Sequence, residues 1–476
     1  MIPNLIGGRW VRPDTSETLP VFDPATGQEI EQVPLSGAHV VEEAVTAAAA
    51  AYPEWSRTPV MERTRLMFRF KSLLEDSFED LSAIVTRHHG KTLDEARGEV
   101  RRGIEVVDFA CGAPTLLQGR TLRGVSGGVD QDLYRFPVGV VAGIPPFNFP
   151  VMIPLWMVPL ALVCGNTFVL KPSERTPLGA VRLAELAGEA GFPDGVLNVV
   201  HGARTEVDAL LESPGVAAVS FVGSAPVAQH VYQAGAAHGK RVQALGGAKN
   251  HLVVMPDANL DETVPAICGS AFGNAGERCL AGSVVVSVGK DRDRLLEPLA
   301  ERAAALKVGP GTESGVDVGP LIRREHRDRV ASYVERGASE GARVVVDGRG
   351  AIERPGFYLG PTLLDGVRPD MSVGSDEIFG PVLSVSHADT LDAAIEQANR
   401  MALGNMAVIF TQSGRAAREF RERVDAGMVG VNVPVAQPFA FYPFSGWKGS
   451  FYGSLHVHGT DGVDFYTRKK VLVSRW

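Results

Sequence analysis

A single cysteine in a glycine- and alanine-rich stretch is the first candidate for chemistry. Residues 273–282 read GNAGERCLAG, and Cys279 stands between Arg278 and Leu280. A cysteine thiolate is a strong nucleophile, and a neighbouring arginine lowers a thiol pKa by stabilising the anion. Attack of such a thiolate on a carbonyl carbon leaves a covalent intermediate on the enzyme. Some other group must then release the acyl group.

A second set of residues has the features of a dinucleotide site. The segment FVLKPSERTPL ends a β-branched run with Lys171 and places Glu174 three residues later, near a predicted helix start. A carboxylate there can accept hydrogen bonds from ribose hydroxyls and would repel a 2′-phosphate, which favours NAD over NADP. In FVGSAPV, Gly223 and Ser224 open a helix whose free amides can bind phosphate. This part of the chain has no GxGxxG fingerprint, so helix capping by SERTP stays an alternative explanation.

The elements that would position these residues alternate between strand and helix patterns. Residues 42–112 are predicted to be mostly helical, because apolar residues recur at three- and four-residue steps. Short β-branched runs then alternate with helical patterns, which is typical of doubly wound α/β folds with parallel sheets. The first series has strands at 138–144, 166–171, 195–202, 216–223 and 240–247; the second has strands at 251–256, 283–288, 342–348, 382–387 and 406–411.

Two segments fall outside this alternation. Residues 119–137 and the C-terminal VDFYTRKKVLVSRW are strand-like, and we expect them to pair as a small antiparallel sheet for subunit contacts. The predicted organisation is therefore an NAD-binding domain from 1–118 and 138–247, a catalytic domain from 248–445, and oligomerisation segments at 119–137 and 446–476. The apolar run from Pro150 is interrupted by Pro154 and Pro159, so it predicts a buried helix and not a membrane span.

Composition limits the possible partners. The chain has 476 residues, 45% of them hydrophobic and 21% charged, and a net charge of -8, which gives no electrostatic argument for nucleic acid. Four cysteines are spread singly, so we expect reduced thiols and no structural zinc site. The N-terminal residues MIPNLIGGRWVRPDTS have no leader pattern. We expect a cytoplasmic protein with small-molecule partners, no membrane partner and no metal.

Five stretches together resemble the aldehyde dehydrogenase superfamily over essentially the whole chain. They are PFNFP (146–150), KPSERTPL, FVGS, NAGERC and DEIFGPV (376–382). The resemblance implies that Cys279 attacks an aldehyde, and that Asn148 and the Cys279 amide bind the developing oxyanion. It also implies that NAD is bound by Pro145, Phe147, Lys171, Glu174, Arg175, Ser224, Gly246 and Glu377.

One family residue is replaced in this chain. Hydrolytic members carry a glutamate four residues before the lysine of ELGGK, where it activates water against the thioester. Here the segment is ALGGAKN, and the position four residues before Lys249 holds Leu245. Without that base we expect the thioester to persist until a thiol arrives, and coenzyme A is the obvious candidate. The chain is thus similar to the CoA-acylating branch, also in GAKNHLVVMPDANL and PFSGWKGSFYG.

The CoA-acylating branch implies a substrate that bears a carboxylate. By position Arg102 and Arg278 would bind that carboxylate, since guanidinium groups suit bidentate contacts, whereas Arg101 is expected to face solvent. The resemblance implies oxidation of methylmalonate or malonate semialdehyde, loss of the carboxylate, and transfer of propionyl or acetyl to coenzyme A. It also implies a homotetramer or dimer. The segment NVPVAQPFAFYPF (432–444) departs from the family pattern at Pro434, Ala436 and Gln437, which leaves substrate preference open.

Three other functions remain as alternatives at this point. The first is a hydrolytic NAD-dependent aldehyde dehydrogenase that makes a free acid. The second is a metal-dependent hydrolase, supported only by His456 and His458 in HVH, which lack a third ligand nearby in the sequence. The third is a catalytically silent protein of this fold, which is hard to reconcile with Cys279, Asn148 and Glu377 together.

Overall fold

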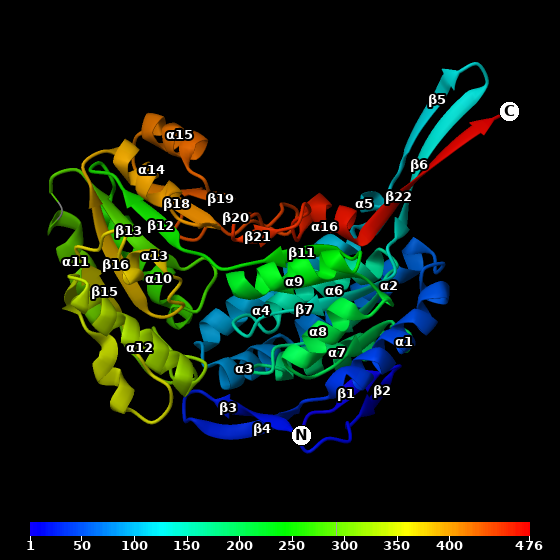
Figure 1. Ribbon diagram of the computed structural model, residues 1–476, viewed down its shortest axis with the longest axis horizontal. Helices are drawn as coiled ribbons and strands as arrows, with labels where there is room; N and C mark the ends of the chain where they lie inside the picture. Colours follow the sequence, from blue (N-terminus) through cyan, green and yellow to red (C-terminus); the bar gives the residue numbers. More distant parts are fainter. Residues whose placement is uncertain (292) are drawn as a thin grey trace.

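Two twisted sheets form the body of the protein in the computed structural model, which describes residues 1–291 and 293–476. The first sheet has the order β2-β1-β9-β8-β7-β10-β11-β21, and its strands from β9 to β11 are parallel (Figure 1). The edge strands β1, β2 and β21 pair antiparallel. Its strands are β1 (Asn4–Ile6), β2 (Arg9–Val11), β7 (Val140–Ile144), β8 (Thr167–Leu170), β9 (Leu197–Val199), β10 (Val216–Val222), β11 (Arg241–Leu245) and β21 (Phe451–Tyr452).

Helices cover both faces of this sheet because its strands are apolar on both sides. Along β7, Val140 and Ala142 belong to one hydrophobic cluster and Val141 to another, as the two-residue period of a strand requires. The first cluster includes α1 and α8, and the second includes α2, α4, α6 and α7. The helices of this lobe are α1 (Gly37–Trp55), α2 (Val60–Asp76), α3 (Phe78–His89), α4 (Leu93–Cys111), α5 (Ala113–Leu116), α6 (Met152–Val163), α7 (Leu178–Ala190), α8 (Arg204–Glu212) and α9 (Ala225–Ala237).

The second sheet has the order β14-β15-β16-β13-β12-β18-β19. Its strands run parallel except β14, which is antiparallel to β15 at the edge, so the expectation of a purely parallel series was wrong there. Its strands are β12 (Asn250–Val254), β13 (Gly282–Val288), β14 (Arg343–Val346), β15 (Thr362–Asp365), β16 (Val382–Ala388), β18 (Met406–Phe410) and β19 (Met428–Val431). Its helices are α10 (Leu260–Phe272), α11 (Asp293–Ala304), α12 (Arg324–Ser339), α13 (Ser372–Ser375), α14 (Leu391–Asn399) and α15 (Gly414–Arg423), with short 3-10 turns η1 (Gly273–Gly276) and η2 (Gly348–Glu353).

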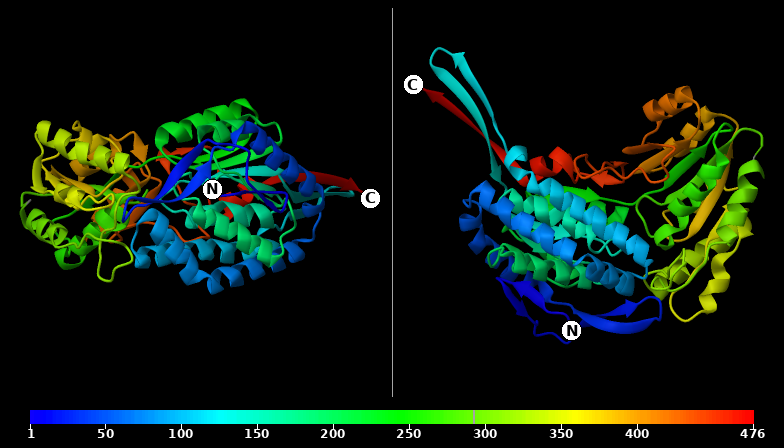
Figure 2. Two further views of the ribbon diagram at one scale, coloured as in Figure 1. Left: turned by 90° about the horizontal axis from the view of Figure 1, so that it is seen from below. Right: turned by 180° about the vertical axis from the view of Figure 1, so that it is seen from behind.

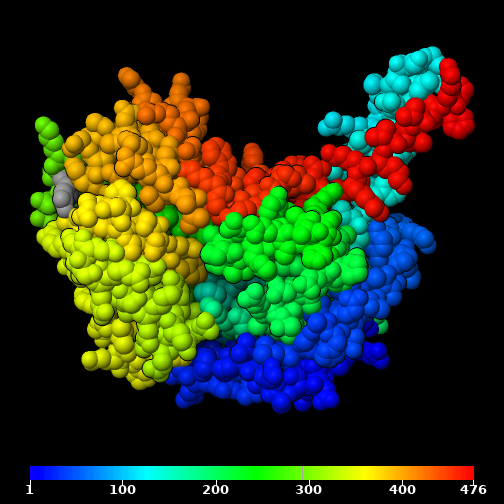
Figure 3. All heavy atoms as spheres, in the orientation of Figure 1, coloured from blue at the N-terminus to red at the C-terminus, as the bar shows by residue number. Residues whose placement is uncertain are grey.

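A three-stranded antiparallel arm extends from the first lobe. The strand β6 (Val129–Pro137) pairs with β5 (Arg120–Ser126) on one side and β22 (Thr467–Arg475) on the other, which confirms the predicted pairing of these distant segments. The arm stands clear of the body in both views of the ribbon (Figures 1 and 2) and in the space-filling view (Figure 3). Its apolar side chains are exposed, and Trp476 at its end is 98% exposed.

Smaller elements complete the chain. The hairpin β3 (Thr18–Asp23) and β4 (Gln28–Pro34) lies along the first lobe, and β17 (Leu403–Gly404) pairs with β20 (Trp447–Lys448). The helix α16 (Gly459–Tyr466) precedes β22. The segment between β19 and α16 returns from the second lobe to the first, where β21 joins the first sheet (Figure 1).

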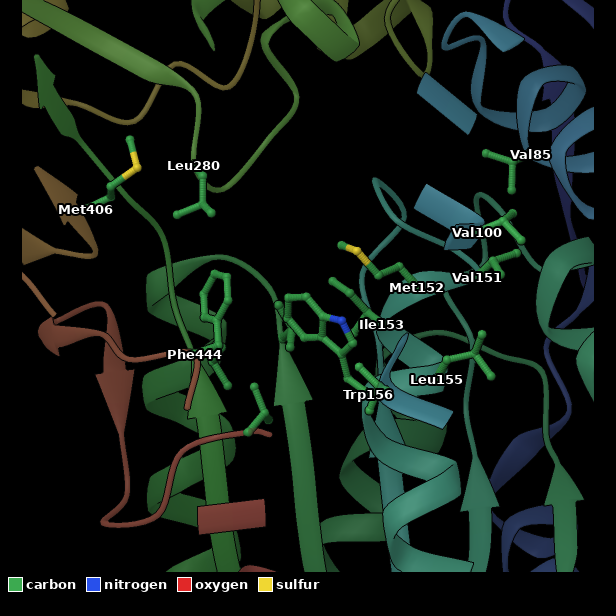
Figure 4. Packing of buried hydrophobic residues seen from close by; sticks show 14 of the residues in the cluster. Val85, Val100, Val151, Met152, Ile153, Leu155, Trp156, Leu280, Met406 and Phe444 are labelled. Atoms are coloured by element: carbon green, nitrogen blue, oxygen red, sulfur yellow. The ribbon is translucent and has the colours of Figure 1, made fainter. Parts of the chain in front are cut away.

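The apolar run after Pro150 forms α6, and each of its residues is buried, as predicted. Trp156 of this helix lies beside Phe444, with ring centroids 5.0 Å apart. Met152 and Leu280 lie on the same side of this aromatic pair (Figure 4). Among the described residues, no helix is both long enough and apolar enough to cross a membrane.

Candidate active site

Cys279 lies in the loop between α10 and β13, and its backbone is held from two directions. Its carbonyl oxygen accepts hydrogen bonds from the side-chain amides of Asn250 and Asn405, each at 2.9 Å. Asn250 begins β12 and Asn405 precedes β18, so strands of the second sheet fix the nucleophile loop. Upstream, Asn274 and Ala275 have left-handed φ values of 56° and 51°. These sharp turns bring the loop back toward the first lobe.

Burial dominates the acidity of the Cys279 thiol. It raises the pKa of Cys279 to about 12, although the charge of Arg278 acts in the opposite direction. The predicted effect of Arg278 is therefore present but is outweighed by desolvation. Cys111, Cys164 and Cys268 are more deeply buried, and desolvation also raises their pKa values. Cys279 alone of the four is partly exposed, and it lines a cavity.

Asn148 follows β7 and faces the same loop. Its side chain is 3% exposed and donates one hydrogen bond to the carbonyl of Glu277 at 2.9 Å. That bond fixes the orientation of the amide, because it identifies the nitrogen end. In the described part of the chain the second N–H of this amide has no hydrogen-bond partner. The arrangement fits the predicted role of Asn148 as an oxyanion donor.

A buried ion pair supports the Asn148 loop. The ammonium of Lys91 lies 2.7 Å from Glu99 and donates to the Asn148 carbonyl at 2.7 Å. The other carboxylate oxygen of Glu99 accepts from the amides of Val151 and Met152, at the start of α6. Such a pair is costly to bury unless every partner is satisfied, and here both are. The sequence analysis missed Lys91 and Glu99 because their partners are some fifty residues away.

Both predicted arginines lie with Cys279 at one cavity of about 310 Å³. Arg102 is 33% exposed, pairs with Glu105 at 2.9 Å and lies 4.6 Å over the ring of Phe439. Arg101 faces outward to Glu75, as expected. The cavity is lined by Lys91, Glu95, Gly98, Glu99, Arg102, Phe149, Met152, Trp156, Asn274, Arg278, Cys279, Leu280, Val435, Gln437 and Phe444.

Two carboxylates that line this cavity accept hydrogen bonds from other parts of the protein. Glu95 completes the capping box of α4 with Thr92 and also accepts the amide of Asn274. Its side chain lies 3.8 Å from Arg278. Glu99 is paired with Lys91. Since their oxygens accept structural hydrogen bonds, neither is arranged as a free base beside Cys279.

Four of the residues that are expected to bind the dinucleotide lie together at one edge of the first sheet. Pro145 follows β7, Lys171 follows β8, Ser224 follows β10 and Gly246 follows β11. These strands are neighbours and parallel, so their carboxyl ends lie together, where α/β sheets bind ligands. Ser224 is the N-cap of α9, which puts free amides at that edge.

Three side chains at this edge have defined neighbours. Lys171 donates to the Gly202 carbonyl at 2.8 Å and lies 3.8 Å from Glu174. The guanidinium of Arg175 lies 5.0 Å over the ring of Phe147. The carboxylate of Glu174 remains partly exposed, as a ribose ligand would need to be.

Glu377 joins the second lobe to the segment after β11. Its carboxylate accepts the amide of Ala248 at 2.8 Å, and burial raises its pKa to about 7. A Cβ added to Gly247 would meet that carboxylate at 2.3 Å, so this close approach requires glycine. Its negative charge also raises the Cys279 pKa.

Leu245 is the last residue of β11, where its register with Phe451 of β21 fixes it in the sheet. It is buried, with an exposed fraction of 4%. Sequence analysis assigned this position to the base of hydrolytic relatives, and an apolar side chain offers no proton acceptor.

Glu277 is a further buried acid near the site that the sequence analysis missed. Burial raises its pKa to about 8, and its carboxylate lies 3.3 Å from His326 and 3.8 Å from His89. Its position between glycine and Arg278 gave no signal, because these partners come from α3 and α12.

The two histidines of HVH have different neighbours. His456 contacts Asp461, whereas His458 packs against Trp156.

Comparison with known proteins assigns the family. Residues 10–472 match the model of the aldehyde dehydrogenase family, and the chain belongs to that family. A full-length relative is malonate-semialdehyde dehydrogenase 2 of Geobacillus kaustophilus, 55% identical over 477 residues that cover 100% of this chain and 99% of the relative. The malonate-semialdehyde dehydrogenase of Halalkalibacterium halodurans is 51% identical over 476 residues, covering 100% and 98%.

Solved structures agree in fold over the whole chain. The crystal structure of methylmalonate-semialdehyde dehydrogenase from Oceanimonas doudoroffii has a TM-score of 0.98 and 48% identity, covering 100% of this chain and 98% of that one. A protein of Sinorhizobium meliloti 1021 assigned as a methylmalonate-semialdehyde dehydrogenase, solved with NAD, has a TM-score of 0.98 and 45% identity over the same shares. The predicted fold class and the predicted resemblance are thereby confirmed.

Proposed function

We propose that this protein is an NAD-dependent, CoA-acylating dehydrogenase of malonate semialdehyde, methylmalonate semialdehyde, or both. The observation that carries the proposal is that Arg102, Arg278 and Cys279 line one cavity. Two guanidinium groups beside a nucleophile suit a substrate that has both an aldehyde and a carboxylate. The names of the full-length relatives support the same substrates.

Addition to the aldehyde would begin at Cys279. The thiolate attacks the carbonyl carbon, and the oxygen becomes an alkoxide that the Asn148 side chain and the Cys279 amide can stabilise. Removing one such donor typically costs 10²–10³-fold in rate. Burial keeps the Cys279 thiol protonated in the enzyme without substrate, and the positive charge of Arg278 favours the thiolate. A substrate carboxylate that binds Arg278 must therefore leave enough of that positive charge near the sulfur.

The strand-end cluster and Glu377 would hold the dinucleotide. The fit rests on the free amides at the start of α9 and on the partly exposed Glu174. Gly246 is packed closely, since an added Cβ would meet the Gly449 carbonyl at 2.6 Å. NAD, when bound, supplies the acceptor for the hydride that leaves the thiohemiacetal carbon. Glu377 would orient a ribose by accepting hydroxyl hydrogens, and Cys279 would then carry a thioester.

Loss of CO₂ from that thioester needs a β-carboxylate whose bonding electrons move into the thioester carbonyl. Carbon dioxide leaves, and the resulting enolate takes a proton at the α-carbon. The oxyanion donors that served the first step can hold the enolate oxygen as well. Decarboxylation is placed after hydride transfer because the carbonyl of the malonyl-type thioester accepts the electrons of the bond that breaks.

Coenzyme A would complete the cycle. Its thiolate attacks the thioester carbonyl, Cys279 leaves as a thiolate, and acetyl-CoA or propionyl-CoA is released. Water is the weaker competitor because Leu245 provides no base, while Glu95 and Glu99 accept structural hydrogen bonds. A thiol needs less assistance, since it ionises near pH 8.5.

Product analysis tests the proposal directly. The purified enzyme is supplied with either semialdehyde and NAD, with and without coenzyme A, and the products are separated by mass spectrometry. We expect acyl-CoA, CO₂ and NADH in equal amounts with coenzyme A, and a slow rate without it. Free acid as the main product in the presence of coenzyme A would instead establish the hydrolytic alternative.

The arm would supply the subunit contacts. Its exposed apolar residues on β22, including Val471, Leu472 and Val473, suit burial against another copy of the chain. On this basis we propose a homotetramer built as a dimer of dimers, with the domain boundaries given above and a cytoplasmic location. Sedimentation of the full chain and of a variant truncated before β22 would test the assembly.

A further inference from the structure

Gln437 is a polar residue in the cavity that the proposed chemistry does not use. It lies in the loop after β19, and it lines the cavity together with Val435 of the same loop. Most of the uncharged wall around it is apolar, formed by Phe149, Met152, Trp156, Leu280 and Phe444. A glutamine in such a wall gives the substrate a hydrogen-bonding group that no apolar neighbour can replace.

The amide of Gln437 is poorly satisfied by the protein itself. Its nitrogen lies 3.7 Å from the sulfur of Met152, which is a weak acceptor. No other side-chain partner of Gln437 occurs within residues 1–291 and 293–476. A primary amide can donate two hydrogen bonds and accept two, so most of this capacity is directed at whatever fills the cavity.

The loop that carries Gln437 is anchored, so the amide is held at this place. The amide of Ala436 contacts the sulfur of Met406 at 3.2 Å. The hydroxyl of Ser270 donates to the Pro434 carbonyl at 2.9 Å. Contacts to α10 and β18 therefore hold the backbone at Pro434 and Ala436, directly before Gln437.

The positions of the other groups limit how a short semialdehyde can lie. Its aldehyde carbon must reach the sulfur of Cys279, and its carboxylate must reach the guanidinium groups of Arg102 and Arg278. Only the central carbon remains between these ends, so its substituent is the part left to meet the other lining residues, Gln437 among them. That substituent is hydrogen in malonate semialdehyde and methyl in methylmalonate semialdehyde.

We propose that Gln437 is a specificity-determining residue that favours malonate semialdehyde over its methyl-substituted analogue. With hydrogen on the central carbon, space remains for water at the amide. A methyl group displaces that water and leaves the amide without partners, which costs free energy. The inference rests on the proposed function, since it concerns the choice between its two substrates.

Replacement of the amide by an apolar side chain of similar length tests this role. We expect Gln437→Met to raise the ratio of kcat/KM for methylmalonate semialdehyde over that for malonate semialdehyde by about ten-fold. The matched control is Gln412→Met, which makes the same change at an exposed residue outside the cavity. The control should leave the ratio unchanged. Both ratios are measured by NADH formation at saturating NAD and coenzyme A.

A charged variant provides a second, independent measurement. Gln437→Glu adds a negative charge to the cavity that binds the substrate carboxylate, so we expect KM to rise for both semialdehydes by about ten-fold or more. KM for propanal, which has no carboxylate, should change less. An unchanged substrate ratio in active Gln437→Met, or a shift toward malonate semialdehyde, would overturn the inference. Failure of the wild type to form acyl-CoA from either semialdehyde would overturn the proposed function instead.

Discussion

The two sides of the Cys279 loop differ in charge. On the cavity side, Arg102, Arg278 and the Lys91–Glu99 pair form a dense charged set. Elsewhere, β11 ends at buried Leu245 and is followed by two glycines, and the carboxylate of Glu377 accepts the Ala248 amide of this segment. The charged side suits a carboxylate substrate, whereas the apolar side lacks a base for water. The proposed function therefore assigns substrate choice and acyl acceptor to different parts of the site.

Removal of the nucleophile shared by both sides should have the largest effect. We expect Cys279→Ala to lower kcat by about 10⁴-fold or more, because the covalent route is lost. NADH formation measures the rate, and NAD titration by fluorescence checks that the cofactor site is intact. Cys268→Ala is the control at a buried cysteine outside the cavity. Equal loss in both variants would contradict the assignment of Cys279.

The arginines test the charged side. We expect Arg102→Leu or Arg278→Leu to raise KM for the semialdehyde by about 10–100-fold, since each removes a charged hydrogen-bond donor. KM for propanal should change little. Arg101→Leu, next to Arg102 but facing Glu75, should behave as the wild type. A similar increase of KM for propanal would show that the arginines act through packing and not through the carboxylate.

The leucine tests the apolar side. Leu245→Glu places a carboxylate at the end of β11, and we expect NADH formation without coenzyme A to rise by about ten-fold or more through hydrolysis. Leu245→Gln has nearly the same shape without a base and serves as the control. Because Leu245 is buried, thermal unfolding of each variant must be compared first. Equal rates for the two variants would mean that position 245 does not face the thioester.

The last prediction concerns the thiol where the two sides meet. Since the pKa of Cys279 is raised to about 12, its thiolate fraction lies far below one at neutral pH. Its alkylation by iodoacetamide should therefore accelerate about ten-fold per pH unit from pH 6 to 9 without levelling off. Arg278→Leu removes a charge that lowers this pKa, so the rate should fall at every pH. A plateau of the alkylation rate near pH 7 would show that the pKa of Cys279 is much lower than about 12.

Much of the fold was predictable because it depends on local pattern. β-branched runs such as residues 140–144 and 283–288 form strands, and the residues after them form the strand-end cluster. The sequence analysis also paired residues 119–137 with the C-terminal strand. It predicted the strand β14 but not its antiparallel direction, and it missed the short strands of the N-terminal hairpin. Edge strands and short hairpins carry weak patterns because few of their residues are buried.

The supporting residues of the site were not predictable in the same way. Glu95 and Glu99 have the spacing of one helical face, which is equally typical of a solvated surface. Lys91 resembles any lysine before a helix. Their role depends on contacts with Asn148, Asn274 and the start of α6, all distant in the chain. No local period records such contacts.

The sequence by itself predicted the nucleophile, the missing base at position 245 and the pair of candidate arginines, and it determined most of the order of strands and helices. These follow from residue type, spacing and resemblance. Only the tertiary structure decided that burial outweighs Arg278 in setting the Cys279 pKa, that Lys91 holds Asn148, and that Gln437 lines the cavity. The physical reason is that desolvation and hydrogen-bond satisfaction depend on every atom nearby, whichever part of the chain supplies it.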